Sequence, residues 1–214
     1  MKFNRVWVFD LDNTLHNASP HIFPHINRAM TTYLQTHLGL DEAGAGALRQ
    51  HYWRCYGATL IGLMRNHATD PQHFLRATHD FPALDRMIVR EPGLRSTLST
   101  LPGRKLVFSN APVHYANDVL KLLGIADLFD DVLSIEQTRY RPKPDSYGFL
   151  KLFSRNRVRA RACIMVEDTL ENLKTAKKLG MSTVWVARAA RIPAYVDFSI
   201  RNLLQLPRLA WQLN

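Results

Sequence analysis

The chain has 214 residues, of which 46% are hydrophobic and 21% are charged, as in a globular protein with one domain or one domain plus an insertion. No apolar run approaches the roughly 20 residues that a membrane helix needs, and the N-terminus lacks the apolar segment of a signal peptide, so we expect a cytoplasmic protein without a membrane segment. The net charge of +10 and the pI of about 9.9 favour anionic ligands.

Short apolar runs alternate with helical patterns along most of the chain. Helices are expected over 113–123 and 169–179, each closed by a glycine. Strands that alternate with amphipathic helices predict an α/β fold with a doubly wound, Rossmann-like parallel sheet. The runs that predict buried strands are residues 6–9, 105–108, 132–135, 163–166 and 183–186.

The gap between the first two predicted strands is too long for a simple crossover connection. It contains helical patterns at 26–38, 42–56 and 71–78 but no convincing strand. We therefore predict a helical cap at residues 16–90, inserted into a catalytic core formed by residues 1–15 and 91–214. The segments near 15–20 and 88–93 would join the two parts.

The first predicted strand ends in two aspartates, Asp10 and Asp12, that are one residue apart. In parallel α/β sheets, ligands bind at the carboxyl ends of the strands. Paired carboxylates at this place suit three tasks: holding a hard cation, attacking an electrophile or moving a proton. A polar loop is the alternative, so the partners of this pair decide the interpretation.

Three further elements supply such partners. Ser109 and Asn110 end the second strand, where a small hydroxyl and backbone N–H groups can bind an anion or simply form a turn. Lys143 lies between two prolines before a helix, which fixes one cation in place, although a surface turn would look the same. Glu167 and Asp168 end the fourth strand and make a second acidic pair that suits Mg²⁺, unless Asp168 caps the next helix.

In this order, the motifs D-x-D-x-T, S-N, K-P and E-D resemble those of the haloacid dehalogenase superfamily of phosphohydrolases. The four motifs span residues 10–168, and the inserted helices resemble the cap of many members. The resemblance implies that Asp10 is the nucleophile that forms an aspartyl-phosphate. Asp12 would be the acid/base that protonates the leaving group, and Thr14 would support the loop.

The same resemblance assigns the phosphate and cation sites. Ser109 and the backbone of Asn110 match the phosphate clamp, and Lys143 matches the lysine that screens the negative charges. The Mg²⁺ ligands would be Asp10, Asp168 and the backbone carbonyl of Asp12, with Glu167 at the outer shell. Mg²⁺ and a lysine offset the repulsion between an anionic nucleophile and an anionic ester. An acid at residue 12 argues against a dehalogenase, because a halide leaving group requires no proton.

The cap sequence from 51 to 63 resembles that of the pyrimidine 5′-nucleotidase branch. Tyr52 and Tyr56 could stack on a base and Arg54 could bind an oxygen, or the aromatic rings could pack within the cap. We expect a phosphatase for pyrimidine nucleoside 5′-monophosphates such as UMP or CMP. Phosphatases for sugar phosphates, phosphoglycolate or pyridoxal phosphate and phosphomutases remain alternatives on the same core.

Charge and metal-ligand residues outside these motifs suggest little further chemistry. Arginines 155, 157, 159 and 161 are expected in a loop without aromatic neighbours to stack bases, so a nucleic-acid-binding module is the weaker hypothesis. Cys55 and Cys163 are far apart in the sequence, and we expect both to be free thiols. His21 and His25 flank Pro24, which argues against one helix presenting both to a zinc ion. We expect a monomer or weak dimer with a small phosphorylated metabolite, such as a nucleotide, as its partner.

Overall fold

A computed structural model describes residues 5–188 and 191–212 of the chain. Residues 1–4, on which the expectation about a signal peptide rests, and residues 189–190 and 213–214 of the predicted core lie outside the described residues. Within the described ranges, no helix is both long and apolar enough to cross a membrane.

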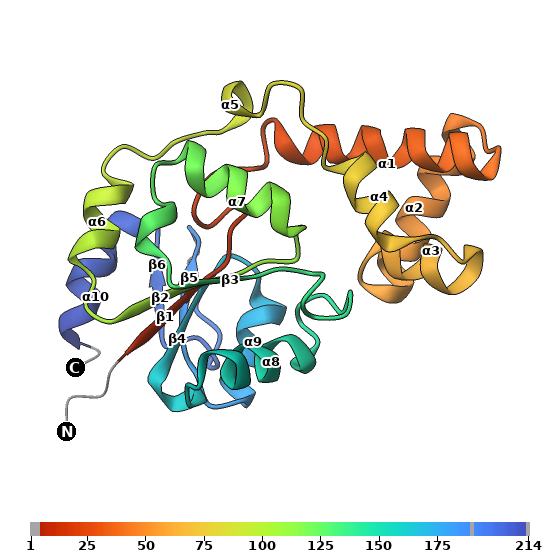
Figure 1. Cartoon of the computed structure of the whole chain (residues 1–214). Coiled ribbons are helices and arrows are strands. Elements are labelled where there is room, and N and C mark those ends of the chain that lie inside the picture. The colour runs from red at the N-terminus through yellow and green to blue at the C-terminus, as the bar shows by residue number, and fades with distance from the viewer. Residues whose placement is uncertain (1–4, 189–190, 213–214) are drawn as a thin grey trace.

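The described residues form a parallel sheet with helices on both faces, which confirms the predicted α/β fold class (Figure 1). Its six strands follow the order β3-β2-β1-β4-β5-β6, so the first strand of the chain lies inside the sheet between β2 and β4. The strands are β1 (Val6–Phe9), β2 (Arg104–Phe108), β3 (Asp131–Leu133), β4 (Cys163–Glu167), β5 (Ser182–Val186) and β6 (Phe198–Ile200).

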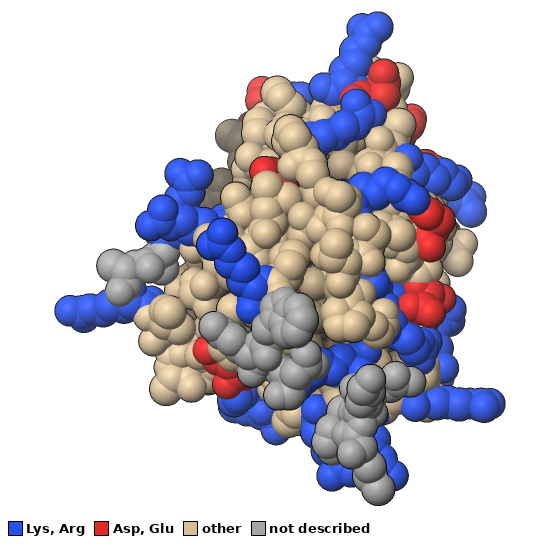
Figure 2. All heavy atoms as spheres, turned by 90° about the vertical axis from the view of Figure 1, so that its left-hand side faces the viewer, with Lys and Arg blue, Asp and Glu red and all other residues tan. Residues whose placement is uncertain are grey.

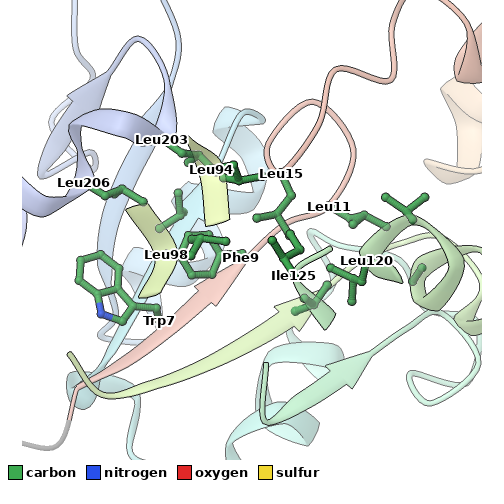
Figure 3. Packing of buried hydrophobic residues seen from close by; sticks show 14 of the residues in the cluster. Trp7, Phe9, Leu11, Leu15, Leu94, Leu98, Leu120, Ile125, Leu203 and Leu206 are labelled. Atoms are coloured by element: carbon green, nitrogen blue, oxygen red, sulfur yellow. The ribbon is translucent and has the colours of Figure 1, made fainter. Parts of the chain in front are cut away.

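Alternate residues of the inner strands enter two separate hydrophobic clusters, one on each face of the sheet, as the two-residue period of a strand requires. Trp7 and Phe9 of β1 pack on one face, where their rings stack on each other and Leu98 and Leu206 lie nearby (Figure 3). Val6 and Val8 face the other cluster. Because β1 is buried on both faces, the backbone position of its last residue is fixed.

Helices from both halves of the chain cover these faces. On the Trp7 face lie α6 (Leu94–Thr100), α7 (Val113–Leu122) and α10 (Leu206–Gln212); on the Val8 face lie α8 (Ser146–Asn156) and α9 (Leu170–Lys178). Short 3₁₀ turns, η1 (Ala126–Leu128), η2 (Ala160–Ala162) and η3 (Leu203–Gln205), connect some of the elements.

Between β1 and β2, the chain forms four helices that pack around a third hydrophobic cluster, and we call these four helices the cap (Figure 1). Asp41 and Asp70 start the second and fourth helices by accepting a backbone N–H, and Gly39 and Gly57 end the first and second in the left-handed conformation. The cap helices are α1 (Ile22–Leu38), α2 (Glu42–Tyr56), α3 (Thr59–His67) and α4 (Pro71–Thr78).

The short helix α5 (Leu84–Met87) returns the chain to the core, since Leu84 and Met87 pack against the Trp7-face cluster. Ile22 of α1 belongs to that cluster as well, so both chain crossings between cap and core are anchored on the core side. The limits of 16 and 90 that we predicted for the cap stay a prediction.

Several predicted details differ in the structure. Helix α1 starts at Ile22 and not at residue 26, because Pro24 lies in its first turn, where no backbone N–H is needed. Arg155 belongs to α8 and forms an ion pair with Asp131, so it is not in a loop. The three-residue strand β6 was not predicted.

On the face of the molecule that carries the chain ends, the basic side chains are spread out. Figure 2 shows the face on the side of the chain ends, away from the cap, where Lys and Arg side chains project around the rim and Asp and Glu are few. They surround a central area of uncharged residues and do not form one continuous stripe.

Candidate active site

The acidic and hydroxyl groups predicted from the motifs meet at the carboxyl edge of the sheet. The strand β1 pairs with β2 on one side and with β4 on the other, and the backbone N–H of Asp10 donates to the carbonyl of Val166 at 3.0 Å. Asp10 and Ser109 follow the last residues of β1 and β2, and Glu167 ends β4. Because parallel strands deliver their ends to the same edge, these three residues become neighbours.

Lys143 joins two of these strand ends through buried ion pairs. Its ammonium group lies 2.6 Å from Asp10 Oδ1 and 2.8 Å from Glu167 Oε2, and it also donates to the carbonyl of Phe108 at 2.8 Å. All three ionic side chains are at most 10% exposed. The three acceptors use all three N–H groups of the lysine, which leaves it one defined position.

Asn110 holds the loop that carries this lysine. Its side-chain amide accepts the backbone N–H of Lys143 at 2.7 Å and donates to the backbone carbonyl of the same residue at 3.1 Å. The lysine loop is therefore tied to the end of β2 on both its backbone donor and its acceptor. The predicted role of Asn110 was its backbone; the side chain adds a second, structural one.

Negative charge exceeds positive charge in this cluster, and the pKa values reflect it. Burial and the neighbouring Glu167 raise the pKa of Asp10 well above its usual range. Burial and Glu167 raise the pKa of Asp168 to about 7. Burial disfavours the charge of Lys143, but Asp10 and Glu167 outweigh it and raise its pKa. One ammonium group thus faces three carboxyl groups.

This imbalance fits a divalent cation. Asp10, Glu167 and Asp168 each offer an oxygen atom, and these atoms lie within 4.8 Å of one another. Carboxylate oxygens are the ligands that Mg²⁺ prefers, and a cation of charge +2 would offset the charge that Lys143 leaves unpaired. Asp168 is not the cap of helix α9, because that position is held by Thr169.

The carboxylate of Asp12 points to different partners. Its Oδ1 accepts a hydrogen bond from the hydroxyl of Tyr115 at 2.6 Å and lies 3.0 Å from Nε2 of His16. Burial and Asp12 raise the pKa of the Tyr115 hydroxyl, so this group stays a donor. Asp10 and Asp12 therefore differ in their surroundings: Asp10 is ion-paired to a lysine, whereas Asp12 is held by a tyrosine hydroxyl and a histidine ring.

Thr14 and Ser109 are both buried but lie differently. Ser109 lines the cavity described below, and its Oγ accepts the backbone N–H of Ala111 at 3.0 Å. Thr14 is buried, and its hydroxyl has no hydrogen-bond partner among the described residues. The supporting role of Thr14 stays a prediction.

A cavity of about 630 Å³ lies between the core and the cap and contains the acidic cluster. The core contributes Asp10, Asp12, Ser109, Asn110, Lys143, Glu167 and Asp168, together with Tyr140. The cap contributes Arg49, Gln50 and Trp53 of α2 and Asn27 and Met30 of α1. All core residues predicted from the motifs except Thr14 thus line one cavity.

The three predicted cap residues do not line this cavity. Tyr52 is buried inside the cap, where its hydroxyl bonds to Nε2 of His67 at 2.7 Å and its ring lies so close to Gly62 that a Cβ there would clash. Tyr56 packs against the same cluster, and Arg54 is exposed with its Nε donating to the carbonyl of Gln50. The aromatic packing alternative therefore describes Tyr52 and Tyr56.

The neighbouring turn of α2 faces the cavity instead. Arg49 donates to Asn27 Oδ1 at 2.7 Å, and Trp53 is 64% exposed, an unusual state for this side chain. Residues 49 and 53 lie on one helix face because they are four apart. The sequence shows an arginine and a tryptophan at this spacing. Only the orientation of α2 in the structure reveals that these two side chains line the cavity.

The family model for haloacid dehalogenase-like hydrolases matches residues 5–180. Phosphate metabolism protein 8 of Saccharomyces cerevisiae is 28% identical over 195 residues, which cover 84% of this chain but only 60% of the yeast protein. Phosphoglycolate phosphatase of Rhodospirillum rubrum is 29% identical over 189 residues, which cover 83% of this chain and 77% of that protein.

Solved structures share the fold. The HAD phosphatase from Thermococcus onnurineus superimposes with a TM-score of 0.69 at 22% identity and covers 96% of this chain and 97% of its own. The L-2-haloacid dehalogenase from Xanthobacter autotrophicus with covalently bound chloropropionic acid has a TM-score of 0.64 at 18% identity, with 98% and 99% coverage. Phosphatases and dehalogenases thus share this architecture, so the side chains at the site must separate the two chemistries.

Proposed function

Since this chain belongs to the haloacid dehalogenase-like hydrolase family, we propose that it is a Mg²⁺-dependent phosphomonoester hydrolase that works through an aspartyl-phosphate on Asp10. The observation that carries the proposal is the buried lysine between the carboxylates of Asp10 and Glu167. A separate carboxylate, that of Asp12, lies in the same cavity and is held by Tyr115 and His16. The two aspartates have the different surroundings that a nucleophile and a proton carrier require.

In the first step, a carboxylate oxygen of Asp10 attacks phosphorus and the bond from phosphorus to the leaving oxygen breaks. Lys143 holds Oδ1 of Asp10, which leaves the other oxygen for the attack. Asp12 gives its proton to the leaving oxygen, so an alcohol departs and not an alkoxide. Ser109 and the backbone N–H of Asn110 hold the phosphoryl oxygens.

In the second step, Asp12 takes a proton from water. The water oxygen attacks phosphorus, the bond from phosphorus to Asp10 breaks, and phosphate leaves. Asp12 is then protonated again, so the cycle closes without a further acid. A Mg²⁺ ion held by Asp10, Asp168 and the carbonyl of Asp12, with Glu167 behind them, would neutralise charge on the phosphoryl oxygens.

The presence of Asp12 favours a phosphatase over a dehalogenase. A halide leaves as a stable anion, whereas an alkoxide requires a proton as it leaves. The proton carrier at residue 12 therefore has a task in ester hydrolysis that it would lack in dehalogenation.

We further propose that the substrate is a nucleoside 5′-monophosphate with a pyrimidine base. The resemblance of the cap sequence supports this substrate, as does an exposed tryptophan in a cavity of about 630 Å³, a volume typical of small-ligand sites. The similarity to a phosphoglycolate phosphatase supports phosphoglycolate as the second candidate.

The test is a panel of phosphomonoesters assayed by phosphate release with Mg²⁺. The panel holds UMP, CMP, AMP, phosphoglycolate, sugar phosphates, pyridoxal phosphate and an aryl phosphate. We expect UMP or CMP to give the highest kcat/KM, and we expect Asp10→Asn to lose on the order of 10⁴-fold or more of the turnover. A wild-type protein that releases no phosphate from any ester, or an Asp10→Asn variant that retains turnover, would refute the proposed chemistry. A higher kcat/KM for phosphoglycolate would refute the nucleotide only.

A further inference from the structure

Two side chains that no motif predicted hold the proposed proton carrier. His16 comes from the same loop as Asp12 and is bridged to it through the backbone. Tyr115 comes from the first turn of α7, just after the loop that contains Ser109. Both side chains are buried, with Tyr115 at 1% and His16 at 3% exposure.

Both side chains reach the same carboxylate oxygen. The Tyr115 hydroxyl donates to Oδ1 of Asp12 at 2.6 Å, and Nε2 of His16 lies 3.0 Å from that same atom. Among the described residues, Oδ2 of Asp12 has no hydrogen-bond partner. The carboxylate is thus held through one oxygen, and the other is available to react.

The tautomer of His16 can be inferred from its surroundings. Its Nδ1 is buried and has no hydrogen-bond partner among the described residues. If the proton were on Nδ1, that N–H would be a buried donor without an acceptor. The unprotonated Nε2 would then face a carboxylate oxygen, which is also an acceptor. Both arrangements are unfavourable. The proton therefore belongs on Nε2, so that His16 donates to Asp12 as Tyr115 does.

We propose that Tyr115 and His16 are positioning residues that hold Oδ1 of Asp12, so that Oδ2 alone carries the transferred proton. This inference rests on the proposed function. In the first step, the bond from Oδ2 to its proton breaks as the bond from the leaving oxygen to that proton forms. In the second step, Oδ2 takes a proton from water. Neither Tyr115 nor His16 gives up its own proton.

The ring of Tyr115 is itself held in place. It lies 5.2 Å from Phe81 and 5.7 Å from His79, measured between ring centroids, and both belong to the segment that leads from the cap to α5. This packing uses the faces and edges of the ring and leaves the hydroxyl free to bond Asp12. A Tyr115→Phe variant therefore keeps the packing and loses only the hydrogen bond.

The first experiment separates steps that require a proton from one that does not. For an alkyl phosphate such as UMP, we expect Tyr115→Phe to lower kcat about 10- to 100-fold, the effect of losing one hydrogen bond to a charged group, with KM within twofold. For p-nitrophenyl phosphate, whose leaving group requires no proton, we expect a burst of one product per site and then slow turnover. A loss of packing alone would not produce that burst.

Tyr33→Phe is the matched control. Tyr33 is a buried tyrosine of the cap whose hydroxyl bonds to Nδ1 of His73 at 2.9 Å, and it does not line the cavity. The Tyr33→Phe variant loses a hydrogen bond between a tyrosine and a histidine, as Tyr115→Phe does, but far from the reacting atoms. We expect wild-type kcat and no burst from this variant.

Rescue tests His16 in the same way. In His16→Gln, the side-chain amide can place an N–H near the position of Nε2, whereas His16→Leu removes the donor. We expect His16→Gln to retain most of the wild-type kcat and His16→Leu to lose about tenfold or more.

Equal kcat values of wild type and Tyr115→Phe on UMP, or no burst on the aryl phosphate, would overturn the positioning role while phosphatase activity stands. If the wild type releases no phosphate from any ester, the proposed function fails, and crystal structures of wild type and Tyr115→Phe decide the positioning role. Rotation of the Asp12 carboxylate in the variant would support the role, and an unchanged Asp12 side chain would overturn it.

Discussion

The two walls of the cavity are built in opposite ways. On the core wall, Asp10, Lys143 and Glu167 are at most 7% exposed and are joined by short ion pairs. On the cap wall, Trp53 is 64% exposed, and the Arg49 side chain forms a hydrogen bond with Asn27 at the partly exposed cavity surface. Groups that must stabilise charge gain from a rigid, water-poor setting, whereas groups that choose a substrate tolerate an open one. We therefore propose that the core fixes the reaction and that the cap selects the substrate.

If the ion pairs of Lys143 hold the core wall together, removal of this ammonium group should damage both activity and stability. We expect Lys143→Met to lower kcat on the order of 10³-fold, as for loss of one preorganised donor. It should also destabilise the fold by about 3–5 kcal/mol, because two buried carboxylates lose their partner. Phosphate-release assays and urea unfolding measure both effects.

Lys105→Met is the control for this change. Lys105 is also buried, but its ammonium group donates to the carbonyls of Leu101 and Gly103 at the other end of β2. This variant should keep the wild-type kcat. A Lys143→Met variant with activity within fivefold of wild type would show that the core wall does not depend on its lysine.

Bound Mg²⁺ should stabilise the acidic part of the core wall. Mg²⁺ at 100 times its dissociation constant adds about 2.7 kcal/mol, or a rise in Tm of roughly 5–10 °C for a protein of this size. We expect this rise relative to EDTA for wild type and for Asp118→Asn, a surface carboxylate that is 54% exposed. Asp168→Asn should lose it. Equal Tm values of wild type with Mg²⁺ and with EDTA would argue against the metal site.

The stability of the protein should depend on pH through His79, which lies between the core wall and the cap wall. His79 ends α4 and touches Tyr115, and burial lowers its pKa from 6.5 to about 4. The unfolded chain therefore binds a proton between pH 6.5 and 4 that the folded chain does not, so stability falls as the pH drops through this range. Because the His79 ring borders the cavity, we expect the unfolding free energy to fall by about 2 kcal/mol, which is less than the full pKa shift would give.

Urea unfolding of wild type and His79→Gln at pH 7 and pH 4.5 tests this expectation. The wild type should lose more stability between the two values than the variant does, since the titrating carboxylates are common to both. Parallel losses in the two proteins would mean that His79 is accessible to protons in the folded state.

The core wall could be predicted from the sequence, and the cap wall could not. Short apolar strands with polar ends place Asp10, Ser109 and Glu167 at one sheet edge, because parallel register leaves no other arrangement. The strand ends were accurate to within two residues for all five predicted strands. The strand β6 has only three residues, Phe198–Ile200, and therefore carries too little periodicity to be recognised.

In the cap, all depends on which face of α2 meets the cavity. Tyr52 and Trp53 are adjacent in sequence but point about 100° apart on a helix. The tyrosine packs onto Gly62 and the tryptophan faces the cavity, a choice made by contacts between helices. The contact of Tyr115 with Asp12 was also beyond prediction, because 103 residues separate the two in the sequence.

The cap wall itself is tested by the smallest expected effect. If Trp53 stacks on the base of a nucleotide, Trp53→Ala should raise KM for UMP about tenfold, which corresponds to the loss of one base–aromatic stack of about 1–3 kcal/mol. The kcat should change little, because the core wall keeps its geometry. An ester without a ring, such as phosphoglycolate, should keep its KM, so the change in the ratio of the two KM values measures the stacking alone.

Arg54→Ala, from the adjacent residue of the same helix, should leave both KM values unchanged because Arg54 does not line the cavity. The reverse outcome, a raised KM in Arg54→Ala and none in Trp53→Ala, would return the substrate site to the face of α2 that the sequence pattern favoured and would require the cap to turn when a substrate binds.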